Sequence, residues 1–462
     1  MSKYDCDRIH FYQYNDVYIL IDINSDSIHQ IDQMTFDLLS FLKEFGSAET
    51  AVSKMEESGY DAEEVREVLA EIDELMEEGI LFSSPDEITS FIPEQDPIVK
   101  AMCLHIAHDC NLRCPYCFAE QGPYGGDLSM MDAETGKAAI DFLFDISGNR
   151  KNLNIDFFGG EPLMNFDVVR ELILYIGDKA KKTGKIPELT LTTNAVLLDK
   201  EKGNFLKEHE ISVVLSIDGR PEVHDKMRYT ANQKGSYDLV MKNIKDFIAD
   251  GYDKYIVRGT FTRHNLDFIK DLEHLSEHGL KNLSIEPVVA EESAAYSIRE
   301  ADIPDVLKTY EELTELLEKE SSFNFFHFNI DIYKGPCLPK RISACGAGTE
   351  YLAVSPKGDL YPCHQFVGNK GFLMGNVEDR LINKVIGKKL QDANVLKKPE
   401  CMKCWARFYC SGGCHASNFY QQEDLFTVYQ TGCEMQKKRI ECSVYLVLKR
   451  ESQGSVNNYF VI

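Results

Sequence analysis

Three cysteines stand close together in the segment Cys110-Asn111-Leu112-Arg113-Cys114-Pro115-Tyr116-Cys117. They follow the apolar run 102–107, which predicts a buried parallel strand, so the cysteines should lie on the loop at its carboxyl end. Open α/β sheets and barrels carry their chemistry at this end. A 4Fe–4S cluster takes four thiolates, and three local thiolates would leave one iron open to an exogenous ligand. A zinc loop is the alternative, but zinc sites usually combine C-x2-C or Cys/His pairs.

Seven of the cysteines in the C-terminal third form a spaced pattern. Cys345 and Cys363 come first, followed by the run Cys401-x2-Cys404-x5-Cys410-x3-Cys414-x18-Cys433. The chain has 14 cysteines in all, which points to metal or redox use if the protein is not exported. A zinc ribbon is the alternative for the tandem pairs.

The first motif, with an aromatic residue directly before its last cysteine, resembles the signature of the radical S-adenosylmethionine (SAM) enzymes. The resemblance implies that Cys110, Cys114 and Cys117 hold a 4Fe–4S cluster and that SAM binds its open iron. It also implies that Tyr116 packs near the adenine. In that family the cluster cleaves SAM to methionine and a 5′-deoxyadenosyl radical, while the protein positions the reactants and excludes water.

The C-terminal pattern resembles the SPASM extension, a domain with two auxiliary clusters found in many radical SAM peptide-modifying enzymes. The resemblance implies two auxiliary 4Fe–4S clusters, and three clusters in the whole chain. One would be held by Cys401, Cys404, Cys410 and Cys433, and the other by Cys345, Cys363 and Cys414. Seven thiolates for eight irons leave one iron without a matched ligand. Either Cys337 completes the second set, or that iron is open to a substrate thiolate.

The region from residue 98 to 320 must position the first motif. Apolar runs typical of strands alternate there with amphipathic helical patterns. The expected strands are 102–108, 153–158, 188–193, 212–217, 255–262 and 282–287, and helical patterns include 133–146, 167–181 and 237–249. Six βα repeats predict a parallel sheet with right-handed crossovers. The resemblance implies an α/β fold of the open, partial (β/α)6 barrel type.

Loops after these strands match further SAM-binding elements of the family. Gly159-Gly160-Glu161-Pro162 follows the second strand, where two glycines would let the backbone approach the methionine end of SAM; a tight turn is the alternative. Asn194 ends the third strand, and Ser216 and Asp218 end the fourth. The resemblance implies polar contacts from these residues to SAM, with Ser216 and Asp218 facing the ribose. Arg228 resembles the residue that pairs with the SAM carboxylate. No general base is assigned.

The first 90 residues form a separate unit in composition. They contain 22 Asp and Glu against five Lys and Arg, which gives −17 of the total net charge of −25. A β-hairpin signal, three amphipathic helices and a strand-like run at 80–82 predict a winged-helix-like domain. This order resembles the precursor-peptide recognition domains that bind a leader peptide as an added strand. An acidic packing or dimerisation domain is the alternative. Residues 83–97, with three prolines, are the expected linker, and the SPASM domain should span 330–450.

Composition excludes some functions. The acidic balance argues against a nucleic-acid partner, which needs a basic footprint. No apolar stretch is long enough to span a membrane, and the first ten residues lack a signal-peptide core, so a cytoplasmic protein is expected. Its oxygen-sensitive clusters would suit an anaerobe.

The whole layout resembles the maturases of SCIFF peptides, the six-cysteine peptides of clostridia. The resemblance implies an oxidoreductase that forms thioether bridges in a ribosomally made, Cys-rich precursor peptide. It also implies an electron donor of the flavodoxin or ferredoxin type. One alternative is an anaerobic sulfatase-maturating enzyme, which makes formylglycine. The other is a non-catalytic Fe–S scaffold or redox regulator, for which the SAM-loop matches would have no use.

Overall fold

The computed structural model describes residues 3–85, 97–319, 322–330, 332, 338–343 and 345–452. Cys337 and most of the expected linker therefore lie outside the described residues. None of the described helices is both long and apolar enough to cross a membrane.

The N-terminal part is an antiparallel sheet followed by helices. Its strands pair in the order β1 (Ile9–Tyr14), β2 (Val17–Asp22) and β3 (Ile28–Ile31). The helices are α1 (Gln33–Phe45), α2 (Ala48–Glu57) and α3 (Ala62–Glu77). Each begins after a residue whose side chain accepts a hydrogen bond from the backbone of the first turn, namely Asp32, Ser47 and Asp61. The expected hairpin and three helices are thus present.

The strand expected at 80–82 is wrong. These residues form bends and turns, and Phe82 has a φ of 49°, outside the strand region. Leu81 and Phe82 are buried in the core of this part, so packing rather than sheet pairing explains the apolar run. The third strand is β3, in which two polar residues separate two isoleucines, so the sequence shows no alternation that would predict a strand.

The centre of the chain is a curved parallel sheet. Within the described residues its strands are β4 (Ala101–Ala107), β5 (Asn152–Gly159), β6 (Ile186–Thr193), β7 (Ser212–Ser216), β8 (Tyr255–Phe261), β9 (Asn282–Pro287) and β10 (Asn324–Phe325). The first six match the expected strands, and β10 adds a short seventh beside β9. The partial-barrel prediction is confirmed.

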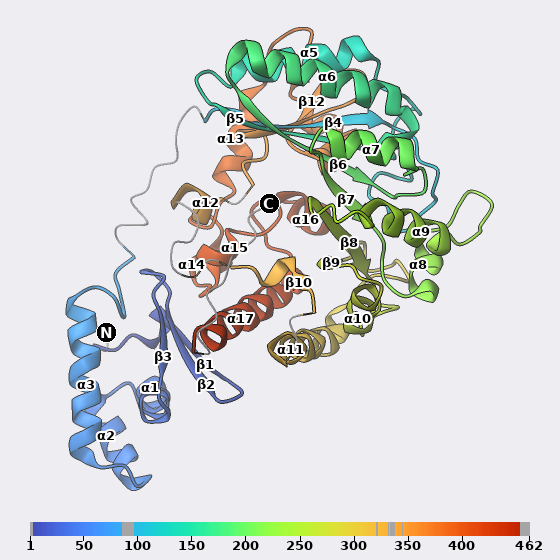
Figure 1. Ribbon diagram of the computed structural model, residues 1–462. Helices are drawn as coiled ribbons and strands as arrows, with labels where there is room; N and C mark the ends of the chain where they lie inside the picture. The colour runs from blue at the N-terminus through green and yellow to red at the C-terminus, as the bar shows by residue number, and fades with distance from the viewer. Residues whose placement is uncertain are drawn as a thin grey trace.

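Helices cover the outer side of this sheet (Figure 1). They are α5 (Ala133–Ile146), α6 (Phe166–Thr183), α7 (Lys200–Glu208), α8 (Pro221–Met227), α9 (Tyr237–Ile248), α10 (Ile269–Glu277) and α11 (Ile303–Lys319). The apolar faces of these helices pack on the strands and form the main core. The carboxyl ends of the strands line the inner side of the sheet.

The C-terminal third extends the same sheet. β11 (Tyr351–Val354) pairs parallel to β4, and β12 (Asp359–Tyr361) and β13 (Gly375–Asn376) continue antiparallel. The strand before the cluster loop is therefore an inner strand between β5 and β11. The helices of this region are α12 (Leu338–Ile342), α13 (Lys384–Asp392), α14 (Pro399–Met402), α15 (Arg407–Cys410), α16 (His415–Gln422) and α17 (Gln430–Ser452).

Helix α17 connects the parts of the molecule. It packs along α11, and the N-terminal sheet lies against its other side (Figure 1). The rings of Tyr14 and Tyr445 stack with centroids 4.4 Å apart, and the Tyr12 hydroxyl donates to the Glu441 carbonyl over 3.1 Å. One face of the N-terminal sheet thus joins the main core through the helix that carries Cys433.

Candidate active site

The loop after β4 is fixed by the loop after β5. The Gly160 N–H donates to the Ala107 carbonyl over 2.7 Å, and the Glu161 N–H donates to the Asp109 carbonyl over 2.9 Å. A Cβ on Gly160 would lie 2.1 Å from the Asp109 carbonyl oxygen, and one on Gly159 would lie 2.3 Å from that of Ala107. Both glycines are therefore required by the contact between two backbone segments, whatever they also offer to SAM.

Asn194 and Glu161 hold the start of the cysteine loop. The Asn194 amide Nδ2 donates to Asn111 Oδ1 over 2.7 Å and lies 3.6 Å from Cys110 Sγ. The Glu161 carboxyl accepts from the Asn194 N–H and the Thr193 hydroxyl, each over 2.8 Å. Burial raises the pKa of Glu161 to about 7, although these donors oppose the increase. Glu161 is fully buried, so it supports the loops from behind.

Asp218 organises the opposite wall. Its two carboxylate oxygens accept from Tyr116 Oη over 2.5 Å, from Arg228 Nε over 3.0 Å and from the Thr260 N–H over 2.9 Å. The Arg228 guanidinium lies 5.6 Å from the centre of the Tyr116 ring. Asp218 itself is fully buried, so Tyr116 and Arg228, rather than its own oxygens, face the interior.

These loops enclose a cavity of about 260 Å³. Of the predicted site residues it is lined by Cys110, Cys114, Cys117, Tyr116, Gly159, Gly160, Asn194, Ser216 and Arg228. Glu161 and Asp218 stand in the layer behind. The structure thus brings the residues of four separate loops into one site, as parallel strands with adjacent carboxyl ends should do.

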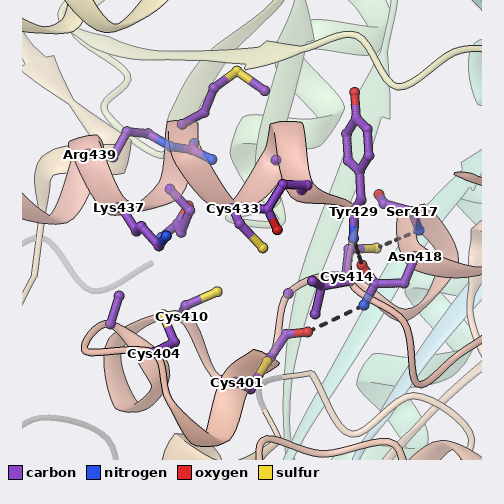
Figure 2. A pocket seen from close by; sticks show the side chains of 18 of the residues that line it. Cys401, Cys404, Cys410, Cys414, Ser417, Asn418, Tyr429, Cys433, Lys437 and Arg439 are labelled. Carbon is purple, nitrogen blue, oxygen red and sulfur yellow. Dashed lines mark hydrogen bonds between the residues drawn. The ribbon is translucent and has the colours of Figure 1, made fainter. Parts of the chain in front are cut away.

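A second cavity, of about 730 Å³, lies in the C-terminal third. Its lining includes Cys345, Cys401, Cys404, Cys410, Cys414 and Cys433. Figure 2 shows Cys401, Cys410 and Cys433 directed toward the same space, with Cys433 on α17. Cys363 does not line this cavity. Burial raises the pKa of Cys363 to about 12, and the neighbouring thiols of Cys414 and Cys345 contribute to the increase, so these three cysteines belong to one region.

The thiols fit iron–sulfur clusters as donor sets. All the described cysteines are free. Burial raises the pKa values of Cys110 and Cys114 to about 12, so these thiols would lose their protons only on binding metal. Among the described residues, no three His, Cys, Asp or Glu side chains are close enough to share a single ion. Thiols that line a common cavity can each bind a different iron of a 4Fe–4S cluster, so they fit such a cluster as donors.

Comparison with known families agrees with this chemistry. Residues 104–275 match the model of the radical SAM superfamily, and residues 345–405 match SPASM, an iron–sulfur cluster-binding domain. The chain is a radical SAM protein with a SPASM domain.

Two curated relatives of this radical SAM protein are named for a role. The subtilosin biosynthesis protein AlbA of Bacillus subtilis is 27% identical over 74% of this chain and 74% of its own length. A cysteine-type anaerobic sulfatase-maturating enzyme of Clostridium novyi is 26% identical over 66% of this chain and 85% of its own.

Solved structures share the fold. The structure of anSMEcpe with bound AdoMet covers 75% of this chain and 98% of its own, with 20% identity and a TM-score of 0.63. Streptococcus suis SuiB bound to S-adenosylmethionine covers 90% of this chain and 96% of its own, with 18% identity and a TM-score of 0.50.

A charged cluster lies between the two cavities; Arg258 on the fifth strand is a cavity candidate from the sequence, whereas Glu286 is not. Arg258 and Glu286 line both of them. The Glu286 carboxylate lies 3.3 Å from His327 Nε2 and 3.4 Å from Arg439 Nη1 of α17. Burial alone would raise the pKa of Glu286, but these basic groups and Arg258 outweigh it and lower the pKa. The place of Glu286 at the carboxyl end of β9 was the signal in the sequence that could have identified it as a site residue. Its partners come from distant segments of the chain.

Proposed function

We propose that this protein forms thioether crosslinks in a ribosomally made, Cys-rich precursor peptide. Each crosslink would join a cysteine sulfur to a carbon of a partner residue. The observation that carries the proposal is the contact between the two cavities, which share Arg258, Glu286, Gln365 and Ser417. A peptide bound across this junction would have one carbon beside the SAM cavity and a thiol beside the auxiliary cysteines. The role of AlbA in bacteriocin biosynthesis supports a peptide substrate.

The reaction breaks one C–H and one S–H bond and forms one C–S bond, so the peptide loses two hydrogens. When bound, SAM and the clusters supply the 5′-deoxyadenosyl radical that takes the hydrogen atom and an acceptor for the remaining electron. The Glu286 carboxylate lines both cavities, and its lowered pKa keeps it ionised and able to accept a hydrogen bond from the peptide thiol, whose proton is released to solvent as the C–S bond forms. Tyr116 would pack near the adenine of SAM and Arg228 would pair with its carboxylate, and the Asp218 carboxylate holds both side chains in place.

The N-terminal part would bind the leader of the precursor. β3 pairs with β2 on one side, and within the described residues no strand pairs with its other side. Such an edge can accept a peptide as an added strand. We expect the electron donor to be a cytoplasmic flavodoxin or ferredoxin. If this part is instead an acidic packing domain, the leader will not bind to it.

The test is anaerobic turnover of the reconstituted protein with a short Cys-rich peptide encoded beside its gene. The product should be lighter by two hydrogens for each bridge, with one free thiol lost and no aldehyde. Tandem mass spectrometry should find the missing hydrogens on one linked pair of residues.

Formylglycine formation is the second candidate, favoured by the similarity to the Clostridium novyi enzyme. It would convert the peptide cysteine to an aldehyde with loss of its sulfur. A non-catalytic scaffold would leave SAM intact under reducing conditions, and that result would contradict both enzymatic candidates.

A further inference from the structure

Lys398 is a fully buried cation beside the auxiliary cysteines. Its side chain is 0% exposed, and it directly precedes α14, which carries Cys401. Its Nζ donates to the Gly412 carbonyl over 2.8 Å, and this is its one recorded side-chain acceptor in the described part of the chain. No carboxylate of the described residues forms an ion pair with it. A buried charge without a counter-ion is costly, so this position calls for an anion.

The surroundings of Lys398 identify where that anion would be. Gly412 lies between Cys410 and Cys414, in a segment where Ser411, Gly412 and Gly413 all have positive φ. Burial lowers the pKa of Lys398, whereas the negative charge of the sulfurs of Cys401, Cys410, Cys433 and Cys414 would raise it and so keep the ammonium group protonated. His415, which is also buried in this region, is no counter-ion, because an imidazole is neutral or positively charged and supplies no negative charge.

Lys398 stands behind the wall of the auxiliary cavity. Gly412, whose carbonyl accepts from Lys398, and Gly413 line that cavity, whereas Lys398 itself does not. It therefore cannot act as a ligand or touch the substrate, but its charge is close to the thiols. A cluster bound by four thiolates has a net negative charge that increases by one on reduction, so a fixed cation stabilises the reduced form more than the oxidised form.

We infer that Lys398 is the buried counter-ion of the auxiliary cluster held by Cys401, Cys404, Cys410 and Cys433, and that it raises the reduction potential of this cluster. The inference rests on the proposed ligand set and deepens the proposed function. A cluster that is easier to reduce is a better acceptor for the electron released when the C–S bond forms. Lys398 thus acts on the cluster through its charge and is not a catalytic residue.

The test is a redox titration followed by electron paramagnetic resonance on the full-length holoprotein. Replacing Cys110, Cys114 and Cys117 by Ala removes the SAM-loop cluster and leaves the auxiliary signals. In this background Lys398→Met should shift the midpoint potential of one auxiliary cluster to more negative values, and Lys398→Arg should stay close to the parent. Lys397→Met is the matched control, because Lys397 is exposed and pairs with Asp392 over 2.9 Å; it should cause no shift. An unchanged potential in Lys398→Met with full iron content would overturn the inference.

Iron content decides the case in which Lys398→Met fails to assemble. If Lys398→Met loses iron while Lys398→Arg retains it, a positive charge is required and the inference stands. If both lose iron equally, the shape of the lysine matters and the inference is wrong. The crosslinking assay on the protein with all its cysteines is a separate readout, so a protein that makes no thioether could still show the potential shift.

Discussion

The SAM cavity and the auxiliary cavity are built in opposite ways. The three cysteines of the SAM cavity lie within eight residues of one loop, and the loops after β5 and β6 hold that loop through backbone hydrogen bonds and Asn194. The auxiliary cysteines come from segments far apart in the chain: Cys345 precedes β11, Cys363 follows β12, and the other five lie on α14, α15, α17 and the segments between them. The first site depends on adjacent strand ends, whereas the second depends on long-range packing of helices.

The two regions also differ in whether their positively charged side chains are paired with carboxylates. In the SAM cavity Arg228 is paired with the Asp218 carboxylate. Near the auxiliary cavity Lys398 has a carbonyl as its acceptor, and Arg407 donates to the Met402 carbonyl and the Asn24 side chain, with no carboxylate among the described residues paired to either. Arg228 is thus neutralised before any ligand binds, while Lys398 and Arg407 have no paired carboxylate among the described residues, which suits a resident anion beside them.

The largest expected effect separates the SAM loop from the rest of the chain. Cys114→Ala should reduce the formation of 5′-deoxyadenosine to background, because two thiolates cannot hold the cluster that SAM needs. Chromatography of the reaction mixture measures it. Cys6→Ala, at a half-buried thiol of the N-terminal part, should cleave SAM like the parent. Cleavage retained in Cys114→Ala would refute the role of the loop.

A ligand on α17 tests whether the two cavities act separately. Cys433→Ala should abolish peptide crosslinking but keep SAM cleavage within a few-fold of the parent, since the SAM cavity does not use α17. Cys442→Ala is the control on the same helix: its sulfur is buried against Tyr14 and Tyr310, so it should cost about 1 kcal/mol of stability and no iron. Equal loss of both activities in Cys433→Ala would show that the cavities depend on each other.

The close backbone contact at Gly160 predicts a large loss of stability when a single methyl group is added there. Gly160→Ala should lower the free energy of unfolding by about 1–3 kcal/mol and weaken SAM binding, because its Cβ would clash with the Asp109 carbonyl. Gly177→Ala, in α6 with no atom within 4 Å of the added carbon, should raise stability by up to about 1 kcal/mol. Denaturant titration compares them, and similar values would mean that the loops adjust freely.

The last prediction compares two hydrogen bonds behind the cavity. Tyr116→Phe removes the donor to the Asp218 carboxylate and should cost about 1.5–3 kcal/mol, with a few-fold loss of SAM affinity. Tyr124→Phe removes a donor to a neutral acceptor, the Gly159 carbonyl at 3.0 Å, and should cost only about 1 kcal/mol. Thermal unfolding and SAM titration of the two variants test this order, and a larger cost for Tyr124→Phe would reverse it.

Local patterns in the sequence determined much of this protein. The spacing of Cys110, Cys114 and Cys117 depends on one loop, and the strand and helix periods of residues 102–287 depend on near neighbours, so all of these could be predicted. The strand expected at 80–82 failed because an apolar run reports burial, which a bend can satisfy as well as a strand.

Tertiary structure alone decided the remaining features. These features depend on residues far apart in the chain. They are the pairing of β11 with β4, the contact of α17 with the N-terminal sheet, the Glu286–Arg439 ion pair between the cavities, and the burial of Lys398 without a paired carboxylate among the described residues. No periodicity links such residues, because their contacts depend on how whole layers pack. The sequence determined which atoms could do the chemistry, and the packing decided which charges and cavities lie next to them.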